Sequence, residues 1–259
     1  MQNFNTPNFS IDLAGDVALV TGTTSGLGHR FAKVLAKCGA AVVLTGRRED
    51  KLICLAEEIR SDGGVCEAFV MDMTDRKSIR AVVSAAEEKL GTITILVNNA
   101  GIPDAQRATK MTDELIDSVI GTNLSGPYIL SCEIARRLID QKRPGRIVNI
   151  SSIAAFDING QSSASLYSVT KAGIVRMTEA LALEWAKFNI NVNCIAPGAF
   201  STEMIDGMVE RIGDFSGTFP RKRFGQPEQM DSTLLFLVSP SSECVTGTVI
   251  KIDDGQNHR

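Results

Sequence analysis

Short apolar segments rich in β-forming residues alternate with longer segments of helical periodicity over most of this chain. The alternation predicts β-α-β units, whose strands lie parallel in one sheet. Because the strands are apolar along nearly their whole length, we expect helices on both faces of the sheet. The expected strands span residues 17–21, 41–45, 67–71, 93–98, 146–151, 190–196 and 248–252, and the expected helices span residues 27–37, 49–61, 75–89, 113–140, 165–187 and 227–238.

These segments predict a fold of the α/β class: one doubly wound, Rossmann-type domain with a seven-stranded parallel sheet. A chain of 259 residues is long enough for one large domain. No repeat, no block of charge and no linker rich in proline, glycine or serine marks the start of a second domain. We therefore expect a single domain over residues 13–259, preceded by a polar arm over residues 1–12.

Composition excludes several classes of partner. The formal net charge is -3, so no basic excess favours nucleic acid or an anionic membrane surface. No apolar segment approaches the ~20 residues needed to cross a bilayer. The cysteines show no C-x-x-C spacing, and the first residues lack the pattern of a secretory signal. We therefore expect reduced thiols, no metal site and a cytoplasmic protein.

A glycine-rich segment, TGTTSGLG from Thr21 to Gly28, follows the first expected strand and leads into a helix. Backbone amides at a helix N-terminus can bind an anion, and glycines let a pyrophosphate approach the backbone closely. The segment therefore predicts a dinucleotide site at the first β-α turn. Its spacing differs from the common G-x-G-x-x-G pattern, so the alternative is a tight turn with no ligand.

The residues at the end of the second expected strand indicate whether the chain prefers NAD or NADP. Sites for NAD usually have an acidic residue about 20 residues after the glycine turn, to bind the ribose 2′-hydroxyl. Here Gly46 stands at that position, and Arg47 and Arg48 follow. A guanidinium can hold a 2′-phosphate, so the segment favours NADP, with NAD possible. The alternative is that both arginines are solvated charges that pair with Glu49 and Asp50.

Two further turns lie at the same predicted edge of the sheet. Asp72 follows the third strand, where it could accept a hydrogen bond from an adenine amino group or cap the helix that begins near Asp75. The Asn99-Ala100-Gly101 turn follows the fourth strand, and its small residues leave room for a flat nicotinamide ring.

The sequence YSVTK places Tyr167 and Lys171 four residues apart on an expected helix, so they share one face. A neighbouring ammonium favours the phenolate and lowers the pKa of a tyrosine, which can then act as a general acid or base. The alternative for this pair alone is a surface cation on an aromatic ring.

The glycine turn, NNAG, TNLSG, NISS, YSVTK and IAPG occur here in the order that characterises the short-chain dehydrogenase/reductase family, which the chain resembles from about residue 13 to residue 255. The members it resembles include 3-oxoacyl-carrier-protein reductases and sugar or polyol dehydrogenases. The resemblance implies a catalytic set of Asn123, Ser152, Tyr167 and Lys171. It implies a cofactor site made of Gly22, Thr24, Ser25, Gly26, Leu27, Arg47, Asp72, Met73, Asn99, Gly101, Tyr167, Lys171, Pro197 and Phe200.

The implied reaction is hydride transfer between the nicotinamide C4 and a ketone or secondary alcohol. Tyr167 would deliver the proton, Ser152 would fix the carbonyl oxygen, Lys171 would hold the nicotinamide ribose, and Asn123 would hold a water. The spacing from Ser152 to Tyr167 is slightly longer than is common in the family, which leaves open whether Ser151 or Ser152 faces the substrate. Asp254-Gly255-Gln256 stands where the family usually has paired glycines.

Residues 199–225 are too irregular for a simple helix and are expected to form a substrate lid. Their apolar side chains suggest a partly hydrophobic substrate, and their basic ones leave open a phosphopantetheine or carboxylate contact, or mere solvation. The expected substrates are 3-oxoacyl thioesters, sugars or polyols, and small ketones. A non-catalytic dinucleotide sensor is the alternative. The family resemblance implies a homotetramer or homodimer.

Overall fold

The computed structural model describes residues 11–157 and 164–257, which contain a seven-stranded parallel sheet in the order β3-β2-β1-β4-β5-β6-β7. The prediction of one doubly wound parallel sheet is confirmed. The strands are β1 (Val17–Thr21), β2 (Ala41–Gly46), β3 (Cys66–Val70), β4 (Ile95–Asn98), β5 (Gly145–Ile150), β6 (Ile190–Pro197) and β7 (Val249–Ile252).

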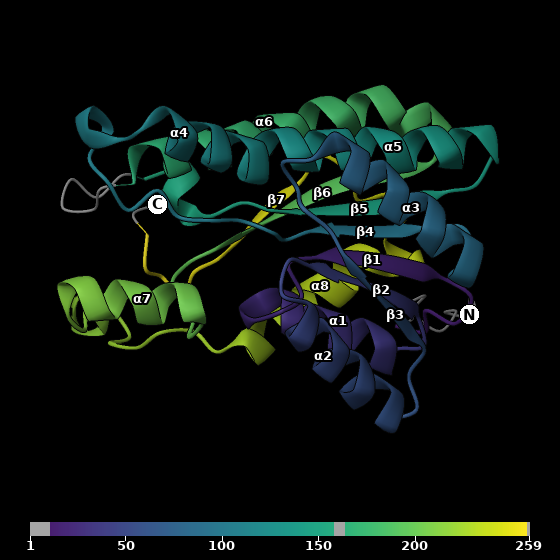
Figure 1. Cartoon of the computed structure of the whole chain (residues 1–259), viewed down its shortest axis with the longest axis horizontal. Coiled ribbons are helices and arrows are strands. Elements are labelled where there is room, and N and C mark those ends of the chain that lie inside the picture. Colours follow the sequence, from purple (N-terminus) through teal and green to yellow (C-terminus); the bar gives the residue numbers. More distant parts are fainter. Residues whose placement is uncertain (1–10, 158–163, 258–259) are drawn as a thin grey trace, which may run out of the picture.

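Helices cover both faces of the sheet. The helices are α1 (Gly26–Lys37), α2 (Glu49–Ser61), α3 (Arg76–Leu90), α4 (Asp113–Ile120), α5 (Gly126–Asp140), α6 (Ser165–Trp185), α7 (Glu203–Ile212) and α8 (Asp231–Val238). Figure 1 shows α1, α2 and α8 on one face and α3, α4, α5 and α6 on the other. Successive strand residues point to opposite faces, so Val20 packs with α1 and α2 whereas Leu19 packs with α3 and α5. None of the described helices is both long and apolar enough to span a membrane.

The expected helix over residues 113–140 is interrupted. After α4, residues Gly121–Ser125 form a π-type turn, and the N of Gly126, the first residue of α5, donates to Gly121 O. A Cβ on Gly126 would lie only 2.5 Å from Met73 O, so the chain passes very close to the segment after β3 here. Periodicity alone could not reveal this close approach, because it depends on a residue 53 positions earlier in the chain.

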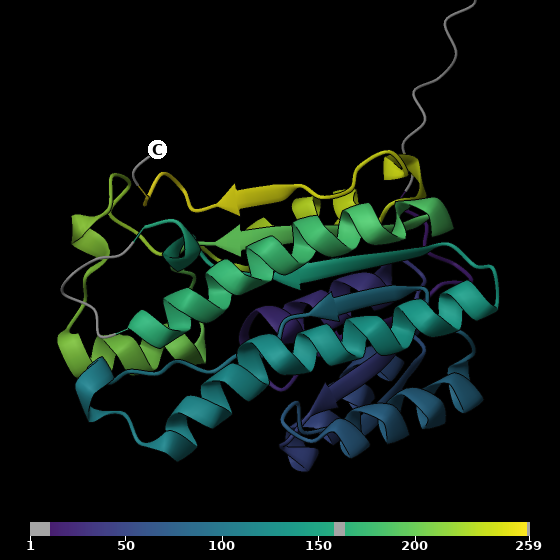
Figure 2. The same ribbon diagram turned by 90° about the horizontal axis from the view of Figure 1, so that it is seen from above.

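The expectation of an irregular segment over residues 199–225 is wrong for its first half, which folds into α7. Acidic Glu203 and Asp206 lie in the first turn and Arg211 in the last, as the helix dipole favours. Gly213, with φ of 83°, then ends the helix in a conformation that L side chains rarely adopt. Figures 1 and 2 show α7 beyond the carboxyl ends of the strands, apart from the two layers that cover the sheet.

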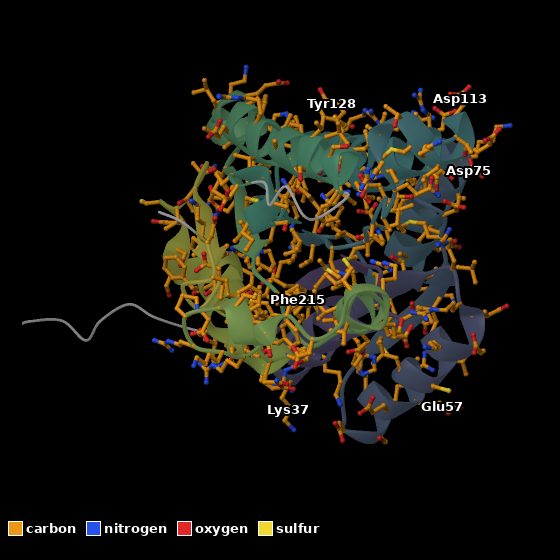
Figure 3. The ribbon with its side chains drawn as sticks, turned by 90° about the vertical axis from the view of Figure 1, so that its left-hand side faces the viewer. Lys37, Glu57, Asp75, Asp113, Tyr128 and Phe215 are labelled. Atoms are coloured by element: carbon orange, nitrogen blue, oxygen red, sulfur yellow. The ribbon has the colours of Figure 1, made fainter. Side chains whose placement is uncertain are left out.

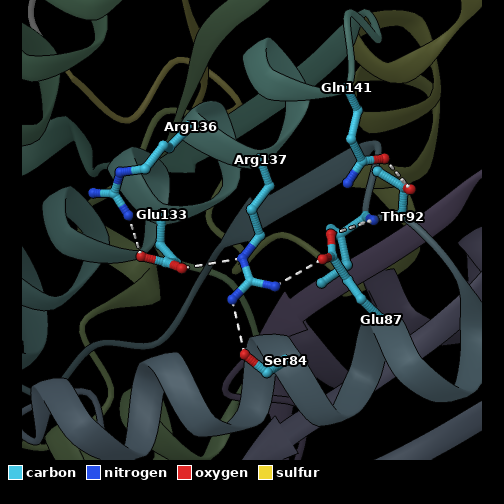
Figure 4. A network of polar contacts seen from close by, with 8 residues as sticks. Ser84, Glu87, Thr92, Glu133, Arg136, Arg137 and Gln141 are labelled. Carbon is cyan, nitrogen blue, oxygen red and sulfur yellow. Dashed lines mark hydrogen bonds and ion pairs between the residues drawn. The ribbon is translucent and has the colours of Figure 1, made fainter.

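Helices α3 and α5 are joined by a polar network at the opposite, amino edge of the sheet (Figure 4). Arg137 on α5 donates to Ser84 and Glu87 on α3, at 2.8 and 2.9 Å, and to Glu133 on its own helix at 3.0 Å. Glu87 also accepts from the backbone N of Ile93, just before β4. These contacts hold α3 and α5 together in one layer. Gly126, the first residue of α5, lies in the same layer near the carboxyl edge of the sheet.

Candidate active site

The glycine turn after β1 forms a cradle that side chains would fill. Gly22 and Gly26 have φ of 71° and 57°. A Cβ on Gly28 would lie 2.2 Å from Gly22 O, so no other residue fits there. Because α1 begins at Gly26, the free amides of its first turn lie beside the cradle. This geometry fits the pyrophosphate of a dinucleotide, as the sequence predicted.

The turn after β4 is hydrogen-bonded to this cradle. Asn99 Nδ2 donates to Thr21 O at 2.9 Å, and the backbone N atoms of Asn99 and Ala100 both donate to Thr21 Oγ1 at 2.9 Å. The Asn99 side chain therefore links the turn after β4 to the start of the glycine turn after β1. Thr21, which the sequence reading did not single out, supplies the shared acceptor.

The end of β2 carries Gly46 where an NAD site usually has an acidic residue, and the Thr24 side chain lies close to it. A Cβ on Gly46 would lie 2.7 Å from Thr24 Cγ2, so a side chain at this position would displace Thr24. Arg47 is exposed, and its charge helps to lower the pKa of Asp72. Arg48 instead folds back onto the glycine turn, where its Nη2 donates to Thr24 Oγ1 at 2.8 Å and to Ser25 Oγ at 2.9 Å.

Glu203, the first residue of α7, joins this arginine to the segment over residues 199–225. Its carboxylate lies 3.0 Å from Arg48 Nη1 and 2.7 Å from Lys51 Nζ. Hydrogen bonds, first with Lys51 and then with Ser25 and Arg48, lower the pKa of Glu203 to about 2. The preceding residue, Thr202, contacts the turn as well, because a Cβ on Gly26 would lie 3.2 Å from its Cγ2. The start of α7 thus rests on the glycine turn and on the beginning of α2.

The segment after β3 excludes one of the two interpretations of Asp72, the helix cap, while the adenine contact stays a prediction. Asp75 caps α3, because its Oδ1 accepts from Lys77 N at 2.8 Å. Asp72 Oδ1 accepts from the N and Oγ1 of Thr74, each at 2.8 Å, and the backbone bond with Thr74 is the main cause of its lowered pKa. Met73 between them is buried. Asp72 therefore shapes the turn after β3 and does not cap the helix.

The structure brings Ser152, Tyr167 and Lys171 together after β5 and on the first turns of α6. Lys171 Nζ lies 5.5 Å from the centre of the Tyr167 ring and donates to Ile150 O at 2.8 Å. The Ser152 hydroxyl, whose Oγ accepts from Ala154 N at 3.1 Å, lies close enough to the Tyr167 phenol to lower its pKa. Ser151 is buried and donates to Lys171 O at 2.7 Å. Of the two serines left open by the sequence, Ser152 is the one that meets the phenol.

The expected lowering of the Tyr167 pKa by Lys171 is wrong for the protein without cofactor. Burial of the phenol raises its pKa, the hydrogen bond with Ser152 opposes this shift, and the charge of Asp104 adds to it. Burial also lowers the pKa of Lys171 to about 8. Tyr167 is therefore protonated at neutral pH and can donate a proton.

Asn123 lies in the π-type turn between α4 and α5. Its Oδ1 accepts from Ile102 N at 2.8 Å, and its Nδ2 donates to Ile102 O at 2.9 Å. A Cβ on Gly101 would lie 3.4 Å from Lys171 Nζ and 3.5 Å from Asn123 Oδ1, so all three residues are neighbours. Both polar atoms of the Asn123 side chain, however, hydrogen-bond to the backbone of Ile102. Asn123 thus shapes the loop after Gly101, and the expected water contact stays a prediction.

Several expected cofactor residues pack into the protein instead of facing a cleft. Pro197 ends β6, and Phe200 just after it is 4% exposed and lies in the hydrophobic core. A Cβ on Gly225 would lie 2.6 Å from Phe200 Cε1, so this ring packs against the end of the segment over residues 199–225. Leu27 packs against the same core from α1. Any contact of these side chains with a cofactor stays a prediction.

The segment after α7 carries an aromatic cluster and two paired arginines. Phe215, Phe219 and Phe224 meet edge to face, with ring centres 5.0–6.1 Å apart. Figure 3, which views the carboxyl edge of the sheet, shows Phe215 next to α7. Arg221 and Arg223 both pair with Asp254, at 2.9 and 2.7 Å. These two cations are therefore partly neutralised within the chain.

Comparison with known proteins agrees with this arrangement. The family model described as short chain dehydrogenase matches residues 16–212. The 3-oxoacyl-[acyl-carrier-protein] reductase FabG of Thermotoga maritima is 37% identical over 94% of this chain and 98% of its own. The 2-dehydro-3-deoxy-D-gluconate 5-dehydrogenase of Formosa agariphila is 33% identical over 94% of this chain and 93% of its own.

Among solved structures, a crystal structure of a variant of actinorhodin polyketide ketoreductase with NADPH superposes with a TM-score of 0.89. It is 31% identical and covers 94% of this chain and 98% of that one. With the glycine cradle and the serine, tyrosine and lysine cluster in place, the chain belongs to the short-chain dehydrogenase family of NAD(P)-dependent oxidoreductases.

Proposed function

We propose that Tyr167, Ser152 and Lys171 carry out the reaction of this oxidoreductase on a ketone or secondary alcohol, with NADP as the preferred cofactor. The observation that supports this most strongly is the meeting of a protonated phenol, a serine hydroxyl and a buried ammonium beside a glycine cradle. The bound cofactor supplies or accepts a hydride at C4 of its nicotinamide ring.

The chain's own residues manage the proton and the developing charge. Tyr167 donates its proton to the substrate oxygen during reduction and takes it back during oxidation. Ser152, whose hydroxyl lies beside the phenol, donates its one hydrogen bond to the same substrate oxygen and holds it in place. Lys171 keeps a positive charge beside the phenol ring while bonded to Ile150 O. Asn123 supports this site by fixing the loop after Gly101.

The preference for NADP is supported by charge and by space. Gly46 cannot be replaced by an acid without displacing Thr24, and Arg47, Arg48 and Lys51 lie around the end of β2. Arg47→Glu should weaken NADP much more than NAD, because the carboxylate would repel the 2′-phosphate. Binding of both cofactors is measured by fluorescence titration, with Arg60→Glu on the far end of α2 as a control. An equal loss for both cofactors would reject the phosphate contact.

The proposed substrates are a 3-oxoacyl thioester, a sugar-derived ketone or polyol, and a small hydrophobic ketone. The first two are supported by the names of the Thermotoga and Formosa relatives. The cluster of Phe215, Phe219 and Phe224 in the lid favours a substrate with an apolar part. NADPH oxidation with a panel from each class tests the proposal. Tight binding of cofactor with no turnover of any ketone would instead favour a non-catalytic dinucleotide sensor.

We also propose a cytoplasmic homotetramer or homodimer. Exposed apolar side chains occur on the outer faces of α5 and α6, where Tyr128 is 49%, Val169 65% and Leu183 84% exposed. Such positions on neighbouring helices favour burial against another subunit. Light scattering should give a mass that falls when Leu183 is changed to Glu. A monomeric mass for the unaltered protein would overturn this part of the proposal.

A further inference from the structure

Asp104 is an acidic residue that the structure buries almost completely, at 3% exposure, in the loop between β4 and α4. Its Oδ2 accepts a hydrogen bond of 3.0 Å from the backbone N of Tyr167. Its Oδ1 accepts one of 2.7 Å from Ala105 N, and Ala105 has φ of 49°. A residue 63 positions away in the chain is thus bonded to the main chain of the tyrosine assigned as the acid.

The hydrogen bond from Tyr167 N to Asp104 takes the place of an N-cap on α6. The first amides of a helix have no partner within it, and a serine, threonine, aspartate or asparagine at the N-cap position usually accepts from one of them. Helix α6 begins at Ser165 after Ala164, which has no side-chain acceptor. Tyr167 N, in the first turn, receives its acceptor from Asp104 instead. A carboxylate at this end of the helix is also favoured by the helix dipole.

The carbonyl of Tyr167 is fixed by a second side chain. Thr170 Oγ1 donates to Tyr167 O at 2.8 Å, and Asn123 Nδ2 lies 3.4 Å from that same Oγ1. Asn123 also binds both backbone groups of Ile102, two residues before Asp104. The main chain on both sides of Tyr167 is therefore attached to the loop after β4, which also borders the expected nicotinamide site.

We propose that Asp104 is a positioning residue of the reaction, which caps α6 from a distant loop and so fixes where Tyr167 presents its phenol. This inference rests on the proposed role of Tyr167 as the proton donor. Catalysis depends steeply on such placement, because a proton passes efficiently only between atoms held within hydrogen-bond reach.

The charge of Asp104 has a second consequence for the same phenol. The groups that face Tyr167 are Ser152 after β5, Lys171 on the next turn of α6, and Asp104 from the loop after β4. Burial and the Asp104 charge raise the pKa of Tyr167, whereas the Ser152 hydrogen bond lowers it. Removing the charge while keeping an acceptor oxygen should therefore make the phenol easier to ionise.

Two substitutions separate these effects. Asp104→Asn keeps an oxygen that can accept from Tyr167 N but carries no charge, whereas Asp104→Ala removes both. We expect Asp104→Ala to lower kcat for ketone reduction by about tenfold or more, with KM and NADPH affinity within about twofold. Asp104→Asn should recover most of kcat. Thr112→Ala, which removes the ordinary cap of α4, controls for loss of a cap elsewhere.

A spectroscopic titration reports the phenol directly. The chain has two tyrosines, Tyr128 and Tyr167, so Tyr128→Phe leaves Tyr167 as the sole source of phenolate absorbance. In that background, Asp104→Asn should move the onset of phenolate absorbance to lower pH by about half a unit or more, while circular dichroism shows an intact fold.

The outcomes are distinct. An unchanged onset in Asp104→Asn would overturn the effect of the Asp104 charge on the phenol. An Asp104→Ala protein with the kcat of the parent would overturn the positioning role. An Asn variant as impaired as the Ala variant would also overturn it, because capping would not be the property that matters. Retained turnover in Tyr167→Phe would instead reject the proposed function itself, and the two failures can be told apart.

Discussion

Lys171 carries a charge that the fold hardly solvates, and this predicts a pH dependence of stability. The residue is 4% exposed, and its Nζ donates to Ile150 O at 2.8 Å. Within the part of the chain that the structure describes, it forms no ion pair with a carboxylate. Burial lowers the pKa of Lys171 from 10.5 to about 8. Lys171→Met nearly keeps the length of the side chain and removes its charge. We expect this substitution to abolish the pH dependence of stability that Lys171 causes.

The size of the effect follows from the two pKa values. A fall from 10.5 to about 8 corresponds to roughly 3 kcal/mol of cost for keeping the ammonium in the folded protein at neutral pH. Between these values the unfolded chain holds the proton and the folded protein does not, so the free energy of unfolding rises with pH. From about pH 7 to about pH 9.5 the contribution of Lys171 should rise by about 2 kcal/mol.

The assay is denaturant unfolding without cofactor, at fixed protein concentration, followed by fluorescence of Trp185. This is the single tryptophan of the chain, lies on the same helix as Lys171 and is 5% exposed. Between the two pH values, the stability of the unaltered protein relative to Lys171→Met should rise by about 2 kcal/mol. Groups that titrate in both proteins cancel in this difference.

Lys37→Met provides the control, because Lys37 is exposed in the last turn of α1. Its side chain is exposed, so the burial invoked for Lys171 does not act on it, and Lys37→Met tests whether the pH dependence belongs to the buried lysine. A stability difference between the unaltered protein and Lys171→Met that does not vary with pH would refute the reasoning. Lys171 would then be solvated or paired in solution.

Two further substitutions test the contacts around the site. Glu203→Gln should raise affinity for NADP about threefold or more with little effect on NAD, since Arg48 and Lys51 lose the carboxylate that competes with a 2′-phosphate. Fluorescence titration measures both affinities, and an equal change for the two cofactors would contradict the expectation. Ser152→Ala should lower kcat about a hundredfold, whereas Ser151→Ala should act mainly on thermal stability, because Ser151 binds Lys171 O. Comparable losses of kcat in the two variants would show that the serines are not separable in this way.

The strands and the glycine cradle could be predicted because their signals are local. Apolar segments such as Val17–Thr21 specify buried strands, and glycines such as Gly28 occur where any side chain would clash. The cluster of Tyr167 and Lys171 was also predictable, since four residues on a helix bring two side chains to one face.

Contacts between distant parts of the chain could not be predicted. Glu203 meets Arg48 across 155 positions, and Asp104 meets Tyr167 across 63, with no periodicity to mark either pair. The direction of the Tyr167 pKa was missed for a related reason. Spacing reveals the nearby ammonium, but burial of the phenol and the charge of Asp104 depend on the folded chain.

The most direct test of the account compares the unaltered protein with Tyr167→Phe, which keeps the ring beside Lys171 and removes only the hydroxyl. The rate of ketone reduction and the affinity for NADPH are measured on the same preparations. We expect kcat to fall at least about a hundredfold while the NADPH dissociation constant stays within about twofold. A Phe variant that retains most of the parent's kcat would contradict the assignment of Tyr167 as the proton donor.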